Sequence, residues 1–262
     1  MKYKLDKDAS GLSLVYSKCV QKLSSYLWKG YSKLVEFLWG KRLPDVDRDP
    51  EYMENGFKLG TLSQDDINPL LSLLKQVPAR KMNSQDCHSE YLNNPYVEDS
   101  KALFSDEFCY YDLSNNKDIL RIFLSNYISK VRACLGYPAR IVNVRCWGTR
   151  TNAREVGPDA WHSDHFAHVI HKILIYLTPA GPGKGTTEMR MKDGSVESIE
   201  GPAGSWVFFN PTNIIHRGVC PSVEGGERII MEVTVTPALK DNFEPVFAGL
   251  NATYPWVPWT KI

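Results

Sequence analysis

The chain has 262 residues, of which 43% are hydrophobic and 23% are charged, and its formal net charge is +1. A chain of this length and composition can bury a self-sufficient core, which excludes wholesale disorder. The near-neutral charge gives no electrostatic reason to expect nucleic acid as a partner, and none is predicted.

The cysteines and the first residues of the chain bear on its location. The six cysteines are irregularly spaced, and none belongs to a CxxC pair. The first ten residues are charged and lack the apolar block of a secretory signal, and no apolar run of about 18 residues occurs. We therefore predict a cytoplasmic protein with reduced, mostly buried thiols and no membrane span.

Residues 1–45 form a predicted helical extension. Apolar residues recur at helical spacing from about Leu12 to Leu38, and Pro44 with the charged stretch 45–50 predicts a linker after them. Four lysines form a narrow stripe away from the centre of the apolar face: Lys18, Lys22, Lys29 and Lys33. Two roles stay open. Packing on the core or in a dimer is the commoner fate of such a helix, and peripheral contact with an anionic membrane is the alternative.

The main domain is predicted over residues 46–240. It begins with a short strand at Gly56–Leu59 and a helix from Gln64 to Gln76, which Ser63 caps and which carries acidic residues in its first turn. A further helix is predicted from about Lys117 to Leu135.

The second half of this domain has the texture of a β protein. Short β-rich runs are separated by Gly and Pro: Ile141–Trp147, Lys172–Thr178, Ser205–Phe209 and Arg228–Thr236. This spacing predicts a sandwich or barrel, and so a mainly β fold with flanking helices. Residues 241–262 are predicted to form an irregular tail packed on this core.

A candidate metal site lies ahead of the second of these runs. His162 and Asp164 are two residues apart, so on extended backbone their side chains point to the same side. His216, which follows the run Ser205–Phe209, can supply a third ligand. Two imidazoles and one carboxylate on one face of an iron ion leave three coordination positions open. Nitrogen and oxygen donors without a thiolate are more typical of an iron(II) site than of a structural zinc site.

Arg228 lies 12 residues after His216 and opens the last apolar run. A buried guanidinium needs an anionic partner, and its planar fork matches a carboxylate. A keto acid that chelates the iron at one end would place its far carboxylate near such an arginine. Asn143, Arg145 and Trp147 share a strand face. If that face is inward, Asn143 and Arg145 are candidates for contact with co-substrate or substrate, because a buried arginine is costly when unpaired.

These segments resemble the phytanoyl-CoA dioxygenase-like family of 2-oxoglutarate- and iron(II)-dependent oxygenases. The segments that carry the resemblance are Trp161–Asp164, Lys172–Thr178, Gly204–Gly218 with its final His-Arg-Gly, and Arg228. The resemblance implies a double-stranded β-helix (a cupin-like jelly roll) with iron ligands His162, Asp164 and His216. It also implies that Arg228 anchors 2-oxoglutarate. Lys172 lies where members of the family often carry a lysine facing the site, which makes it a second candidate for 2-oxoglutarate contact.

The implied activity is that of a dioxygenase which uses 2-oxoglutarate and dioxygen, hydroxylates a small-molecule or lipid-like substrate, and releases succinate and carbon dioxide. The presence of Asp164 favours hydroxylation over halogenation, because related halogenases generally leave that position empty for a halide. Two alternatives stay open: a non-catalytic jelly-roll binding protein, and a cupin-like metalloenzyme that does not use 2-oxoglutarate. His165, His168 and His171 follow the motif, and we expect them to be solvated or at the rim of the site, with a direct role in substrate binding as the alternative.

Overall fold

The computed structural model describes residues 49–77, 79–81, 108–111, 131–136, 138–150, 159–164, 170–238, 240–241 and 247–248, together with Tyr127 and seven residues between Tyr26 and Leu38. The described helices are α2 (Pro50–Asn55) and α3 (Gln64–Gln76). The strands are β1 (Phe57–Thr61), β2 (Ala79–Lys81), β3 (Phe108–Tyr111), β4 (Ala139–Arg150), β5 (His171–Tyr176), β6 (Thr186–Arg190), β7 (Val196–Ser198), β8 (Ser205–Phe209), β9 (Ile215–Val219), β10 (Glu227–Pro237) and β11 (Phe247–Ala248).

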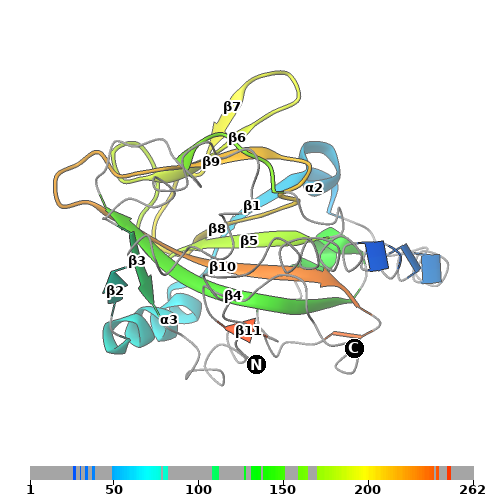
Figure 1. The fold of residues 1–262 in the computed structure, drawn as a ribbon, viewed down its shortest axis with the longest axis horizontal. Helices are drawn as coiled ribbons and strands as arrows, with labels where there is room; N and C mark the ends of the chain where they lie inside the picture. Colours follow the sequence, from blue (N-terminus) through cyan, green and yellow to red (C-terminus); the bar gives the residue numbers. More distant parts are fainter. Residues whose placement is uncertain are drawn as a thin grey trace, which may run out of the picture.

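The strands form two sheets that face each other (Figure 1). The larger sheet has the order β1-β8-β5-β10-β4-β3-β2, and the smaller sheet has the order β7-β6-β9. Every pairing along these two orders is antiparallel. Two facing antiparallel sheets joined by connections that cross between them are what the predicted jelly roll requires.

The larger sheet is covered on both faces, which explains the composition of its central strands. All six residues of β5 and all five of β8 are buried. One apolar cluster lies between the sheets and includes Trp147, Tyr176 and Phe209. A second cluster lies on the opposite face and includes Ile173 and Phe208 together with residues of α3. A strand buried on both faces has no need of polar alternation, so β5 and β8 are nearly continuous apolar runs.

Strand β10 alternates between these two faces. Met231, Val233 and Val235 belong to the cluster on the helix side. Ile230 belongs to the cluster between the sheets, so Arg228 and Glu232, two residues away on either side, point into the same space. The period of two therefore brings buried charged side chains into the interior of the jelly roll.

Helix α3 covers the outer face of the larger sheet. Its buried residues Ile67, Leu70 and Leu73 recur at steps of three, as one face of a helix requires. The side chain of Ser63 caps the helix by accepting a hydrogen bond from the backbone N–H of Asp66 at 3.2 Å. The prediction of this helix, with its cap and both ends, is confirmed.

Helix α2 begins inside the predicted linker and corrects its last two residues, Asp49 and Pro50; residues 44–48 lie outside the described residues. The side chain of Asp49 accepts a hydrogen bond from the N–H of Tyr52 at 3.1 Å, and Pro50 occupies the start of the helix. A proline is favourable there because its missing N–H has no partner in the first turn of a helix. Gly56 ends the helix with a φ of 78°, a conformation that glycine adopts without strain.

The C-terminal tail, the helix predicted from Lys117 and the cysteines are described only in part. The tail is not irregular throughout, because β11 pairs with β4 at Asn143 and Val144, beside the stretch of β4 that β3 covers. Tyr127 and residues 131–135 are helical, whereas the rest of the helix predicted from Lys117 lies outside the described residues. Four described cysteines are free thiols: Cys109, Cys134, Cys146 and Cys220.

Most of the N-terminal extension also lies outside the described residues. The seven that are described are helical, and their apolar members are exposed: Tyr26, Leu27, Leu34, Phe37 and Leu38. Among the residues that the structure describes, no helix is long and apolar enough to cross a membrane.

Candidate metal centre

The backbone joins the two predicted histidine ligands. His162 donates its N–H to the carbonyl of His216 at 3.0 Å, and His216 donates its own N–H to the carbonyl of His162 at 2.8 Å. The N–H of Asp164 donates to the carbonyl of Pro211 at 2.8 Å. These bonds fix the segment 162–164 against β9 and the turn before it, although the two parts are about 50 residues apart in sequence.

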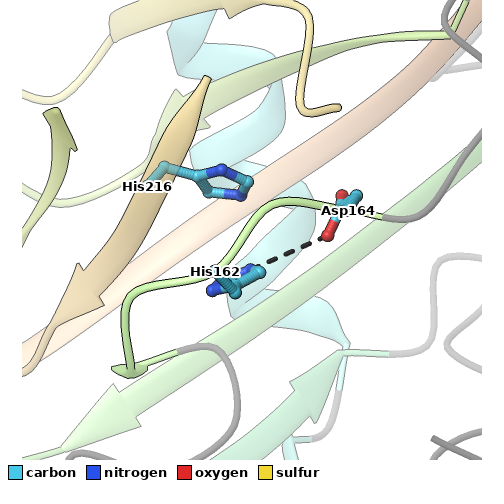
Figure 2. Close-up of side chains that lie close together, drawn as sticks. All are labelled: His162, Asp164 and His216. Atoms are coloured by element: carbon cyan, nitrogen blue, oxygen red, sulfur yellow. Dashed lines mark ion pairs between the residues drawn. The ribbon is translucent and has the colours of Figure 1, made fainter. Parts of the chain in front are cut away.

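The three predicted ligand side chains converge on one point (Figure 2). One ligand atom from each of His162, Asp164 and His216 lies within 4.8 Å of the others. Nε2 of His162 is 3.7 Å from Oδ1 of Asp164, and the two imidazole rings have centroids 4.4 Å apart. The structure therefore brings together all three residues that the sequence singled out.

Backbone carbonyls orient both imidazoles. Nδ1 of His162 lies 2.8 Å from the carbonyl oxygen of Ala160, and Nδ1 of His216 lies 3.0 Å from that of Ile214. A carbonyl can only accept, so Nδ1 carries the proton in each ring and Nε2 is left as a lone-pair donor. This arrangement is how metal-binding histidines are usually held.

Burial and charge set the protonation states that a cation needs. Burial, with a smaller contribution from His162, lowers the pKa of His216 to about 4. Burial alone would raise the pKa of Asp164, but the Lys172 ammonium and the two histidines outweigh it and lower that pKa to about 2. At neutral pH His216 is therefore neutral and Asp164 is ionised, which are the forms that bind a metal ion. The donor set and its charge fit iron(II).

Arg228 is buried between the sheets, with 2% of its surface exposed. Its Nη1 donates to the carbonyls of Thr186 and Val219, the latter at 3.1 Å. The nearest carboxylate oxygen in an ion pair is Oδ1 of Asp159, 4.0 Å from Nη2, and Nε has no hydrogen-bond partner among the described residues. A buried guanidinium with spare donors fits the carboxylate of a keto acid.

Gly218 gives this guanidinium its space. A Cβ on Gly218 would lie 2.7 Å from Nη2 of Arg228 and 2.7 Å from Oδ1 of Asp159. Gly218 follows His216 by two residues on β9, so both face the interior at a separation of about 7 Å. The Arg228 guanidinium, which lies against Gly218, is therefore on the same inner face as the ligand His216.

The other three residues predicted to contact co-substrate or substrate lie on the same inner face, and one of them, Arg145, is paired there with Glu232 at 2.7 Å. Asn143 is buried, and its Oδ1 has no hydrogen-bond partner among the described residues. Nζ of Lys172 lies 2.5 Å from Oδ2 of Asp164 and 3.1 Å from Oε2 of Glu232. Contact of either residue with 2-oxoglutarate stays a prediction.

The prediction for His171 is wrong. His171 is 6% exposed and stacks on Phe208, with ring centroids 5.1 Å apart and an angle of 7° between the planes. Because Lys172 faces the metal centre, its neighbour His171 must face the helix side of the sheet. His165 and His168 lie outside the described residues.

Sequence reasoning missed three residues of the site: Asp159, Gly218 and Glu232. Glu232 had a detectable signal, because a carboxylate inside an apolar strand four residues after Arg228 shares its face. Gly218 stood in the quoted His-Arg-Gly, but its close approach to Arg228 is visible only in three dimensions. Asp159 had no signal in the sequence.

No protein-family model and no curated relative matches the sequence. The fold does resemble solved structures. SnoN, a non-heme α-ketoglutarate-dependent epimerase from nogalamycin biosynthesis, aligns with a TM-score of 0.55 and 13% identity over 78% of this chain and 85% of its own. SnoN in complex with Fe3+, α-ketoglutarate and nogalamycin RO gives 0.54 and 13%, over 78% and 86%. A Pseudomonas putida prolyl-4-hydroxylase gives 0.47 and 17%, over 75% and 98%. The likeness to SnoN confirms the predicted fold: the chain is a mainly β jelly roll.

Proposed function

We propose that the protein is a 2-oxoglutarate- and iron(II)-dependent dioxygenase that hydroxylates a small molecule. The observation that carries this proposal is the convergence of His162, Asp164 and His216 beside Arg228, a buried arginine with spare donors. Iron(II), 2-oxoglutarate and dioxygen would together supply the oxidising chemistry, with release of succinate and carbon dioxide.

Each residue has a defined part in this proposal. His162, Asp164 and His216 would occupy one face of the metal, and the carbonyls behind both imidazoles would keep Nε2 directed at it. Arg228 would hold the far carboxylate of the keto acid through its fork. The resemblance to the phytanoyl-CoA dioxygenase-like family supports the same assignment for Arg228.

The outcome of the oxidation and the substrate are separate questions. The presence of Asp164 favours hydroxylation over halogenation, because a carboxylate ligand occupies the position that a halide would need. SnoN is named as an epimerase, so a shared fold does not select among oxidative outcomes. A small molecule is the substrate class that we propose, since SnoN binds nogalamycin RO within the same fold.

Anaerobic titration with iron(II) and then 2-oxoglutarate, followed by visible absorption, tests the proposal. We expect a weak metal-to-ligand charge-transfer band in the wild type, no band in His162→Ala, and a band that needs more 2-oxoglutarate in Arg228→Ala. Arg150→Ala is the matched control, because Arg150 lies on the adjacent strand and pairs at the surface with Glu227 at 3.6 Å. This control should titrate like the wild type.

The outcomes separate the proposal from its alternatives. Iron bound through His162 without any 2-oxoglutarate band would favour a cupin-like metalloenzyme of another chemistry. Absence of iron binding in the wild type would favour a binding protein without a metal.

A further inference from the structure

Four charged side chains form a continuous chain that leads from the metal centre into the larger sheet. Lys172 bridges Asp164 and Glu232, at 2.5 Å and 3.1 Å. Glu232 in turn accepts two hydrogen bonds from Arg145, one from Nε at 2.7 Å and one from Nη2 at 3.0 Å. The guanidinium of Arg145 lies over the ring of Trp147, 5.1 Å from its centroid.

The strand register builds this chain. Glu232 on β10 stands directly opposite Arg145 on β4, and Lys172 on β5 is opposite Thr234, one diagonal step away. All of these residues point between the sheets, where their neighbours on the same strands are Trp147, Ile230 and Leu174. The chain therefore stands beside an apolar cluster and not at the surface.

These charged side chains are buried, which is unfavourable for stability. The side chains of Glu232 and Lys172 are only 4% and 6% exposed. Removing two charges from water is unfavourable, and apolar side chains of similar size usually stabilise a core at least as well as a buried ion pair. Stability alone therefore gives no reason to place a Lys–Glu pair at this position.

The two carboxylate oxygens of Asp164 have different neighbours. Lys172 contacts Oδ2, whereas Oδ1 is the oxygen that lies 3.7 Å from Nε2 of His162. An ammonium this close would compete with a metal cation for the carboxylate if nothing shared its charge. Glu232 shares the positive charge of Lys172, and Arg145 balances the negative charge of Glu232. The four formal charges therefore sum to zero, and the negative charge of Asp164 remains for the metal.

We propose that Glu232 is a positioning residue of the metal centre: it restrains Lys172, so that Lys172 fixes one oxygen of Asp164 and leaves the other for the metal. The proposal deepens the proposed function and rests on it only through the assignment of Asp164 as a ligand. It also gives Lys172 a structural task at the metal that does not require contact with 2-oxoglutarate.

Cobalt(II) binding, followed by visible absorption, tests the proposal without turnover. Glu232→Gln keeps the shape of the side chain but removes the carboxylate charge that shares the Lys172 ammonium with Asp164. We expect cobalt(II) affinity to fall by about tenfold or more, the range typical of groups that orient metal ligands. Glu188→Gln is the matched control, because Glu188 pairs with Arg217 at 2.8 Å beside His216 but touches no ligand. This variant should bind cobalt(II) like the wild type.

A second substitution separates positioning from a general effect of charge. In Lys172→Met the second oxygen of Asp164 becomes available, so the absorption spectrum of bound cobalt(II) should change. In that background Glu232→Gln should lose most of its effect, because Glu232 acts through Lys172. Lys172→Arg should restore the wild-type spectrum at least in part, and circular dichroism checks that each variant is folded.

The outcomes distinguish failure of this inference from failure of the proposed function. No cobalt(II) binding in the wild type, or binding that survives His162→Ala, would remove the metal centre itself. Binding that depends on His162 but is unchanged in Glu232→Gln would overturn only the role of Glu232. Should Glu232→Gln fail to fold, an unchanged cobalt(II) spectrum in Lys172→Met would overturn the role just as directly.

Discussion

Arg145 and Arg228 both lie on the inner face of the larger sheet, and the protein satisfies them in opposite ways. Arg145 makes a two-bond contact with the Glu232 carboxylate, at 2.7 Å and 3.0 Å. Arg228 bonds backbone carbonyls, its nearest ion-paired carboxylate oxygen is 4.0 Å away, and its Nε has no hydrogen-bond partner among the described residues. The difference teaches which arginine can receive a ligand: a guanidinium already paired with a carboxylate is structural, and one held by neutral carbonyls can still accept an anion.

The largest expected effect concerns the structural arginine. Arg145→Ala leaves Glu232 buried with Lys172 as its one remaining charged partner among the described residues. We expect the free energy of unfolding to fall by about 3 kcal/mol, because the Glu232 carboxylate stays buried without the guanidinium that compensates its desolvation. Urea denaturation measures this loss. A fall below about 1 kcal/mol, which is typical of surface pairs, would mean that Arg145 is not needed to balance Glu232.

The next effect concerns the arginine that we assign to the keto acid. Arg228→Ala should weaken 2-oxoglutarate binding by about 30-fold, equivalent to about 2 kcal/mol for a charge-assisted contact. Metal affinity should stay near that of the wild type, since Arg228 contacts no metal ligand. Calorimetric titration of the metal-free protein with metal, and of the metal-loaded protein with 2-oxoglutarate, measures the two affinities. Equal losses of 2-oxoglutarate affinity in Arg228→Ala and Arg145→Ala would erase the distinction between the two arginines.

A smaller effect should come from the glycine beside Arg228. Gly218→Ala places a Cβ 2.7 Å from Nη2 of Arg228, so the guanidinium must move. We expect 2-oxoglutarate affinity to fall by about tenfold, or about 1.4 kcal/mol, with metal binding retained. Gly148→Ala is the control, because its nearest contact would be 3.2 Å from the flexible end of Glu227. If Gly218→Ala binds 2-oxoglutarate like Gly148→Ala, the space around Arg228 does not limit binding.

Asp159 should have an effect of the opposite sign. Burial raises the pKa of Asp159 while the Arg228 guanidinium opposes that rise. Where this carboxylate is ionised, it repels a second carboxylate that approaches Arg228. Asp159→Asn should therefore strengthen 2-oxoglutarate binding by about threefold, as expected for removal of one partly exposed charge near the ligand. Weaker binding in Asp159→Asn would show instead that Asp159 orients Arg228 productively.

The smallest effect concerns the N-terminal helix, whose packing and membrane roles are both open. The apolar side chains of Leu34 and Phe37 are exposed, so substitution there tests the membrane role. If the helix lies on an anionic membrane, Leu34→Glu with Phe37→Glu should reduce co-flotation with liposomes that contain anionic lipid. Equal flotation of wild type and variant would exclude the membrane role.

Sequence patterns predicted the parts of the fold that one segment determines by itself. The Ser63 cap and the apolar spacing of α3 gave both ends of that helix, and the apolar composition of β5 and β8 marked strands buried on both faces. Strands β6, β7 and β9 were not predicted. Each of them mixes polar with apolar residues, and β7 has no buried residue, so none shows the apolar composition that marked β8.

The metal ligands of the candidate site were predictable from the sequence, but the contacts around them were not. His162, Asp164 and His216 could be proposed because their residue types and the spacing of the first two suit a metal. The partner of Lys172 could not, because the contact of Lys172 with Glu232 depends on the register of β5 against β10. Gly218 and Asp159 likewise gain their meaning only when β9 and the segment before His162 are folded against Arg228.

A crystal structure of the protein with manganese(II) and 2-oxoglutarate, in which manganese stands in for iron without turnover, would test the central claim most directly. We predict manganese held by His162, Asp164 and His216, chelated by one end of 2-oxoglutarate, with the far carboxylate on the fork of Arg228. A metal at other residues, or a 2-oxoglutarate carboxylate bound by Arg145 in place of Glu232, would contradict the account.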